Sequence, residues 1–241
     1  MRTIAIGDVH GCSKALRGLI DAIAPTSSDR LIFLGDYVDR GPDSRGVLDC
    51  LLELESHCQS TFLLGNHDIM FRGVIRGLDP HLWLEIGGQP TLASFGGTLA
   101  HIGQRYVDFL DRCLPFYETQ THIFVHANYH HDLPMENQPE QALFWEHLNV
   151  RMPLPHISGK HVVCGHTPQS NGEISRHTHL TCIDTACYAG LWLTGWCIET
   201  GETWQVSAQG HLRQRPLWQR WQRWLQSRLR GVGMRQASAG E

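Results

Sequence analysis

LIFLGDYVDRG, at residues 31–41, joins a run of apolar residues to a cluster of charged ones. The apolar part, residues 31–34, is typical of a buried β-strand, and Gly35 follows it directly. Asp36 comes next, and Asp39 and Arg40 lie three and four residues further on. Open α/β sheets place their reactive groups at the carboxyl ends of buried strands, so this stretch predicts a functional site.

Two other stretches repeat this arrangement. RTIAIGDVHG at residues 2–11 contains Asp8 and His10, and TFLLGNHD at residues 61–68 contains Asn66 and His67. Apolar residues recur at helical spacing in the two intervening segments, residues 13–24 and 44–58. Alternating strands and helices of this kind build a parallel sheet whose strand ends share one edge. We therefore expect the polar groups of the three stretches to lie close together.

The rest of the chain adds two predicted strands that end in histidine. Residues 122–125 precede His126, and residues 161–164 lead through a glycine to His166. Residues 80–120 have a less regular, mostly helical pattern, which indicates an insertion or cap beside the site. Residues 180–206 have the pattern of three short strands, and we expect them to pair in antiparallel fashion.

Length and composition fit one catalytic domain followed by a tail. The 241 residues are 41% hydrophobic, which is enough for a sizeable core, and we place the domain at residues 1–207. Residues 208–241 are expected to form a basic, tryptophan-rich helix with a disordered end. From residue 211 onward there are seven arginines and one acid, a net charge of +6, so residues 1–210 carry −10. The acidic body suits a cation site, and the tail suits docking on the domain or contact with a partner or an anionic membrane surface.

The sequence also indicates where in the cell the protein is found and which kinds of partner it binds. Its eight cysteines form no C-x-x-C pair, and the first strand begins too early to leave room for a signal peptide. No apolar run approaches the roughly 18 to 20 residues of a membrane span. We expect a cytoplasmic protein with reduced thiols. No nucleic-acid partner is expected, because no recognised binding fold surrounds the short basic segment.

The groups at the strand ends are oxygen and imidazole donors, namely Asp8, His10, Asp36, Asn66, His126 and His166. A donor set without thiolates favours divalent ions such as Mn²⁺, Fe²⁺, Zn²⁺ or Mg²⁺ over a structural zinc site. Asp36 has the central place and is suited to bridge two ions. Two ions about 3.5–4 Å apart can activate a shared water and clamp a phosphoryl group. The sequence therefore predicts a cofactor of two divalent metal ions.

The remaining charged residues of these motifs fit the other needs of phosphoryl transfer. His67 lies beside a ligand but is not needed for ligation, so we predict that it is the general acid for the leaving oxygen. Asp39 is the best candidate to orient its imidazole. Arg40 offers a planar, permanently charged group to phosphate oxygens.

The sequence resembles the PPP-type metallophosphoesterases, which include protein serine/threonine phosphatases and symmetrical diadenosine tetraphosphatases. The motifs that carry the resemblance occur in order as GDVHG (7–11), GDYVDRG (35–41), GNHD (65–68), VHA (125–127) and GHT (165–167). The resemblance covers about residues 2–205 and implies an α/β fold, a four-layer α/β/β/α sandwich of the calcineurin-like type. It also implies a dinuclear centre, usually supported by manganese in bacterial members. By this likeness Asp8, His10 and Asp36 bind one ion, and Asp36, Asn66, His126 and His166 bind the other.

One departure from the family pattern concerns the second residue that binds the phosphate group. Relatives have a second arginine just after a tryptophan, whereas FWEH at residues 144–147 places His147 there. Arg151 lies one helical turn further on and is the other candidate for this role. Tyr188 matches a residue that lines the site in relatives, although an aromatic core residue would fit its position equally well.

Three functions are compatible with these motifs. The preferred prediction is a phosphoprotein phosphatase acting on serine and threonine, with tyrosine left open, in which a metal-bridging hydroxide attacks phosphorus in line and His67 protonates the leaving oxygen. The alternative is a symmetrical dinucleoside tetraphosphate hydrolase, which the short chain disfavours modestly. A catalytically dead scaffold for a phosphorylated partner is the least favoured, because such a binder has no need of His67. The partner is accordingly a phosphorylated protein or a small phosphoester.

Overall fold

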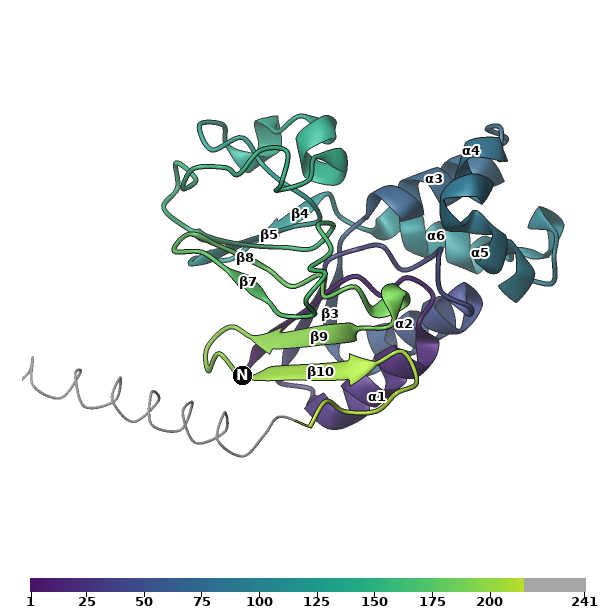
Figure 1. Cartoon of the computed structure of the whole chain (residues 1–241), viewed down its shortest axis with the longest axis horizontal. Helices are drawn as coiled ribbons and strands as arrows, with labels where there is room; N and C mark the ends of the chain where they lie inside the picture. Colours follow the sequence, from purple (N-terminus) through teal and green to yellow (C-terminus); the bar gives the residue numbers. More distant parts are fainter. Residues whose placement is uncertain (215–241) are drawn as a thin grey trace, which may run out of the picture.

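The computed structural model describes residues 1–214, which form two five-stranded β-sheets with helices outside them (Figure 1). The first sheet has the order β10-β9-β1-β2-β3. Its central strands run parallel, β1 beside β2 and β2 beside β3, whereas β9 pairs antiparallel with both β1 and β10. The strands of this sheet are β1 (Thr3–Ile6), β2 (Arg30–Phe33), β3 (Gln59–Phe62), β9 (Trp192–Cys197) and β10 (Thr203–Ser207).

Helices α1 (Ser13–Ile23) and α2 (Ser44–His57) cross from one parallel strand to the next, as the apolar spacing predicted. In α1, Leu16, Leu19 and Ile23 are buried and belong to the core cluster beneath this sheet. The α2 helix begins where the side chain of Asp43 accepts a hydrogen bond from the backbone N–H of Gly46, an N-cap that satisfies an otherwise free donor. The first three motifs are thus held by a β-α-β-α-β unit.

The second sheet has the order β4-β5-β6-β8-β7. Its strands are β4 (Phe116–Glu118), β5 (His122–Val125), β6 (His161–Cys164), β7 (Ser175–Arg176) and β8 (Leu180–Cys182). The prediction of three antiparallel strands in residues 180–206 is correct only for β9 and β10. Strand β8 pairs parallel with β6 and therefore belongs to the other sheet. Periodicity shows that a strand exists but not which partner it takes, since both faces of β8 are buried.

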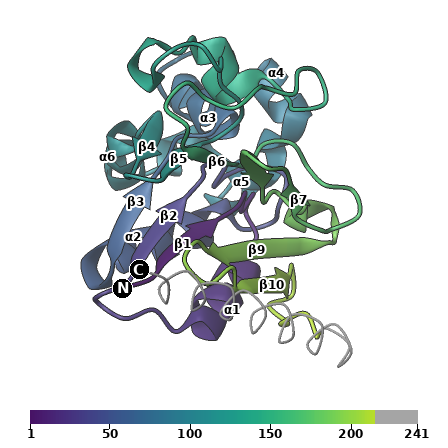
Figure 2. The ribbon, with the colours of Figure 1, turned by 90° about the vertical axis from the view of Figure 1, so that its left-hand side faces the viewer.

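The two sheets pack face to face (Figure 2). The alternation of side chains along each strand explains the continuous apolar runs. Ile32 of β2 faces the second sheet, whereas its neighbours Leu31 and Phe33 face the helices. In β5, Phe124 faces the first sheet, whereas Ile123 and Val125 face the outer layer and are buried beneath it. A strand buried on both faces needs apolar residues at every position.

The outer layer on the second sheet consists of short helical turns and loops. These turns are η3 (Met135–Asn137) and η4 (Gln141–Trp145), which bury Met135, Leu143 and Phe144 against it. The order of layers is helices, sheet, sheet and helical turns, so the predicted four-layer α/β/β/α fold is confirmed.

The chain between strands β3 and β4 is mainly helical, as predicted. It lies at one end of the molecule (Figure 1). It includes α3 (Asn66–Ile75), α4 (His81–Trp83), η1 (Leu84–Gly88), α5 (Gln89–Ser94), η2 (Leu99–His101) and α6 (Gln104–Arg112). Helix α3 begins at Asn66, so the GNHD motif forms the N-cap and the first turn of this helix. Trp83 and Phe95 pack against Phe71 of α3 and tie the segment to the core.

The end of the domain continues beyond β10. Arg213 donates hydrogen bonds to Gly172 and Gln205, so residues just past 207 still contact the domain. The predicted basic helix falls almost wholly on residues 215–241, outside the described part of the chain. Within residues 1–214, no helix is both long and apolar enough to cross a membrane.

Candidate metal centre

The five motifs meet where the carboxyl ends of strands from both sheets converge. Asp8 and His10 follow β1, Asp36 follows β2, and His126 follows β5 directly. Backbone hydrogen bonds join the loops: His10 N donates to Asp36 O (2.8 Å), and Gly165 N donates to His126 O (2.8 Å). His166 N donates to a carboxylate oxygen of Asp8 (2.9 Å), which links the two sheets at this point.

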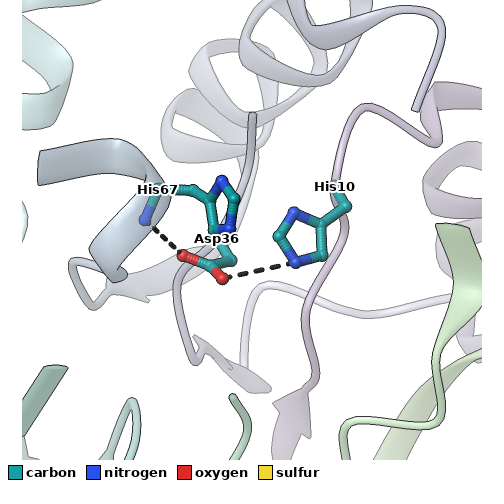
Figure 3. A group of neighbouring side chains, drawn as sticks. All are labelled: His10, Asp36 and His67. Atoms are coloured by element: carbon teal, nitrogen blue, oxygen red, sulfur yellow. Dashed lines mark hydrogen bonds and ion pairs between the residues drawn. The ribbon is translucent and has the colours of Figure 1, made fainter. Parts of the chain in front are cut away.

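Asp36 lies at the middle of the assembly and is buried (Figure 3). Its Oδ2 is 3.3 Å from Nε2 of His10, and its Oδ1 is 3.6 Å from Nε2 of His126. The backbone N–H of His67 donates to Oδ1 at 3.0 Å. Burial acts to raise the pKa of Asp36, but the surrounding histidines, His126 above all, outweigh it and hold that pKa below its usual range. The central carboxylate is therefore ionised.

Two of the imidazoles are held in one tautomer by backbone carbonyls. Nδ1 of His10 is 2.9 Å from Val38 O, and Nδ1 of His126 is 2.8 Å from Leu34 O. Because a carbonyl only accepts, Nδ1 carries the proton and the Nε2 lone pair faces Asp36. Burial lowers the pKa of His10 to about 3 and that of His166 to about 3. Imidazoles that present Nε2 to the site in this way are suited to ligate a metal ion.

The donor set fits two divalent cations. One group comprises His10, Asp36 and His67, and a second comprises Asp36, His126 and His166; within each, the donor atoms lie within 4.8 Å of one another. Asp8 Oδ1 and His166 Nε2 are buried and have no hydrogen-bond partner within residues 1–214. Such atoms are costly to bury unless something satisfies them. A cation held by the predicted ligands would do so.

Asn66, the remaining predicted ligand, joins the second group through its side chain. Its Oδ1 is 3.1 Å from Nε2 of His126. The amide is buried at the first residue of α3, so the helix fixes its position. The structure therefore brings all six predicted ligands together. Their assignment to individual ions stays a prediction.

Two motif glycines are required by the carboxylates that pack against them. A Cβ at Gly65 would lie 2.2 Å from Asp36 Oδ1, and a Cβ at Gly165 would lie 2.0 Å from Asp8 Oδ1. Each distance is far below a van der Waals contact. Any side chain at these positions would displace a predicted metal ligand.

His67 and Asp39 form a buried pair at the edge of the centre. His67 Nδ1 is 2.8 Å from Asp39 Oδ2, which leaves Nε2 of the imidazole for the site. Burial raises the pKa of Asp39, although the bonds from His67, Thr91 and Trp83 act in the opposite direction. The arrangement is the one predicted for a general acid and the carboxylate that orients it.

Trp83 and Thr91 are contacts of this pair that our sequence reasoning did not single out. Trp83 Nε1 donates to both oxygens of Asp39 (3.0 and 2.9 Å), and the Thr91 hydroxyl donates to Oδ1 (2.8 Å). Both residues belong to the segment WLEIGGQPT, which lies in the predicted cap. The run at residues 83–96 resembles bacterial members of the family, and that likeness was the local signal.

The predicted phosphate-binding groups differ in whether they contact the predicted metal ligands. Arg40 Nη1 is 3.2 Å from Nε2 of His10, and its guanidinium lies 4.5 Å from the centre of the Tyr188 ring. His147 stacks on His166, with ring centres 4.1 Å apart. Arg151 instead forms an ion pair with Glu146. Of the two candidates for the second phosphate contact, His147 is thus the one in contact with a predicted ligand.

Asp184 is a further buried acid for which the sequence suggested no role. Its Oδ1 accepts a hydrogen bond from Ala186 N (3.0 Å). Burial raises its pKa to about 7. The nearby charge of Asp184, after burial itself, is also the largest cause of the raised pKa of Asp8.

Comparisons with known proteins agree with this geometry. The model of the calcineurin-like phosphoesterase family matches residues 1–189. A symmetrical bis(5'-nucleosyl)-tetraphosphatase of Coxiella burnetii is 28% identical over 88% of this chain and 93% of its own length. The enzyme of the same name from Nitrosomonas europaea is 35% identical over 53% of this chain, a match that spans only 44% of that relative.

Solved structures show the same fold. The crystal structure of a proposed diadenosine tetraphosphatase superposes with a TM-score of 0.66 at 22% identity, over 85% of this chain and 92% of the other. A cold-active protein-tyrosine phosphatase of a Shewanella species gives 0.64 at 14% identity, over 88% and 79% of the two chains. Together with the family match and the converging motifs, this architecture shows that the chain belongs to the calcineurin-like phosphoesterase family.

Proposed function

We propose that this protein hydrolyses bis(5'-nucleosyl) tetraphosphates with the aid of two divalent metal ions. The observation that carries the metal-dependent chemistry is the buried Asp36 carboxylate, which lies between the imidazoles of His10 and His126 and belongs to both groups of donor atoms. The choice of substrate is supported by relatives named symmetrical bis(5'-nucleosyl)-tetraphosphatases, one of which aligns over 88% of this chain. The prediction of a phosphoprotein substrate is not confirmed. The short chain does not argue for it, since the Coxiella relative aligns over 93% of its length.

The ions would be held by the six predicted ligands, with Asp36 shared. When bound, they would supply Lewis acidity and an activated water for attack on phosphorus. We further propose manganese as the metal, on the resemblance to bacterial relatives. Arg40 would bind phosphate oxygens, as its planar guanidinium suits an oligophosphate chain.

His67 would donate a proton to the leaving oxygen while Asp39 keeps its ring oriented. This pair also supports a second candidate function. A nucleoside diphosphate leaves readily as an anion, whereas the alkoxide of serine or threonine needs a proton. The presence of His67 as a proton donor therefore makes phosphoprotein hydrolysis the second candidate function.

The test is a direct comparison of substrates. Protein freed of metal by a chelator is assayed with and without Mn²⁺, Fe²⁺, Zn²⁺ or Mg²⁺ on diadenosine tetraphosphate, a phosphoserine peptide and a phosphotyrosine peptide. Metal-dependent release of ADP, at a kcat/KM at least tenfold above either peptide, is the expected result. Faster release of phosphate from a peptide would replace the proposal by the second candidate function. Asp36→Asn is the control and should be inactive on every substrate.

A further inference from the structure

The segment from Trp83 to Thr91 contacts both Asp39 and Arg40. The side chains of Trp83 and Thr91 bond the Asp39 carboxylate, as described above. The backbone of the same segment bonds the next residue, because Arg40 N donates to Gly87 O at 2.9 Å. A cap that merely covered the site would not need bonds to two adjacent functional residues.

These bonds hold a strained backbone. Asp39 has φ 73° and Arg40 has φ 66°, so two consecutive residues with side chains adopt the left-handed conformation. Each such residue costs about 1 kcal/mol or more and persists only where its surroundings enforce it. The Asp39 N–H donates to the Thr91 hydroxyl at 2.8 Å, and the Arg40 N–H is held by Gly87. Gly87 itself must lack a side chain, because a Cβ there would lie 2.8 Å from Cγ of Arg40.

The proton positions in this network are determined by its members. The indole N–H of Trp83 can only donate, and Asp39 can only accept while it is ionised. The Thr91 oxygen accepts from Asp39 N, and the Ser44 hydroxyl, 2.7 Å away, can donate to the same oxygen, so the hydrogen of Thr91 is available for Asp39 Oδ1. Three side chains therefore donate to one fully buried carboxylate: His67, Trp83 and Thr91. Its plane is fixed and aims one oxygen at His67.

We infer that Trp83 and Thr91 are positioning residues for the His67–Asp39 pair, which makes residues 83–91 part of the proton-donating machinery. The inference rests on the proposed function only in taking His67 as the proton donor. Neither residue touches the reacting atoms in this arrangement. Both act through Asp39.

The kinetic test uses leaving groups of different basicity. Thr91→Val keeps the shape of the side chain and removes the hydroxyl, and Thr91→Ser keeps the hydroxyl. With Mn²⁺, Thr91→Val should lower kcat for an alkyl phosphate by roughly 10- to 100-fold, a part of what a general acid contributes. For p-nitrophenyl phosphate, whose leaving group needs no proton, kcat should change less than threefold. KM should stay unchanged in both cases, and Thr91→Ser should restore most of the loss.

Ser94→Ala is the matched control. Ser94 lies in the same helix and bonds Thr91 O and Arg45 N, but it does not contact Asp39. A general loosening of α5 would slow both variants and both substrates alike, and that result would overturn the inference. Trp83→Phe, which keeps a ring and loses the N–H, should reproduce the Thr91→Val pattern.

A second measurement does not depend on activity. In the metal-free protein, the side-chain Nδ1–H of His67 should give a proton NMR signal that is protected from solvent exchange and absent in His67→Asn. In Thr91→Val this signal should shift and exchange faster, whereas Ser94→Ala should leave it unchanged. An unaltered signal together with unaltered kcat would refute the inference. Wild-type protein that is inactive on every phosphoester, with the signal still responding, would refute the proposed function instead.

Discussion

The floor of the candidate site and its rim are built in different ways. The floor, formed by Asp36, His10, His126 and His166, is buried, and its groups are fixed by backbone atoms or by one another. The rim includes His147, which is partly exposed and is held by ring stacking. Floor residues follow buried strands, whereas His147 follows a short helical turn in an irregular stretch. Rigid placement of the floor thus comes from the sheet ends, whereas His147 at the rim is positioned by a contact between side chains.

Backbone strain separates the two regions as well. Within residues 1–214, seven residues other than glycine have positive φ, and five of them belong to the predicted site: His10, Asp36, Asp39, Arg40 and His166. His147 is not among them. Strain of this kind survives where the surrounding fold enforces it. The floor is therefore costly to build, and changes there should have larger effects than changes at the rim.

After the complete loss expected for Asp36→Asn, the largest effect is expected at the edge of the floor. His67→Asn should lower kcat on a phosphoserine peptide or an alkyl phosphate by about 10²- to 10⁴-fold, the usual contribution of a general acid. Loss of ADP formation from diadenosine tetraphosphate should be much smaller, because that leaving group is stable as an anion. Steady-state kinetics on both substrates, with metal content measured in the same samples, provides the check.

The metal content decides how this result is interpreted. His67 also lies within the first group of donor atoms, together with His10 and Asp36. If His67→Asn loses a metal ion along with activity on all substrates, the imidazole is a ligand and its assignment as the acid is wrong. If His67→Asn keeps its metal and loses activity only on substrates with poor leaving groups, His67 is the general acid and not a ligand.

A smaller effect is expected at the rim. His147→Ala should raise KM about tenfold with kcat little changed, because a contact made equally in ground state and transition state acts on binding. Arg151→Ala should change KM less than twofold, since that guanidinium is paired with Glu146. Its loss should cost about 1 kcal/mol of stability or less, as is usual for partly exposed ion pairs. The reverse order of the two KM values would place Arg151 at the phosphate.

The sequence predicted the floor well because strand ends impose local rules. An apolar run followed by glycine and a polar donor identifies a loop at the sheet edge, and five such loops converge in the structure. The pair of His67 and Asp39 was found because both residues lie within those motifs.

Contacts made by irregular segments could not be predicted in the same way. Trp83 and Thr91 reach Asp39 through a π-helical turn at residues 84–88, a geometry with no periodic signal in the sequence. The ion pair between Arg151 and Glu146 depends on a loop that takes its shape from tertiary packing. Strand β8 was expected to pair antiparallel with the strands that follow it but pairs parallel with β6, because burial on both faces is compatible with either partner.

The last prediction concerns stability rather than catalysis, at the buried acid Asp184, which has no rim counterpart. Burial raises its pKa to about 7 from an ordinary value of 3.8, so the folded protein holds this proton where the unfolded chain has lost it. The stability that this group contributes is fully present below about pH 4 and is lost as the pH rises through about 7. In the metal-free protein, Asp184→Asn should therefore match wild type near pH 4 and be the more stable protein at pH 8. The difference should be a few kcal/mol at most, since one pKa unit corresponds to about 1.4 kcal/mol.

Chemical denaturation of both proteins at several pH values, in the presence of a chelator, measures this difference. Asp21→Asn, at an exposed position of α1, is the control and should run parallel to wild type. If the free energy of unfolding depends on pH in the same way for Asp184→Asn and wild type, burial does not raise the pKa of Asp184 in the folded protein. Addition of Mn²⁺ should reduce the difference between the two proteins, because a bound cation near Asp8 and Asp36 would favour the ionised form of Asp184 as well. The acids buried beside the floor, Asp8 and Asp184, would then make the metal-free protein less stable at neutral pH than the metal-bound protein, whereas a solvated rim would show no such dependence.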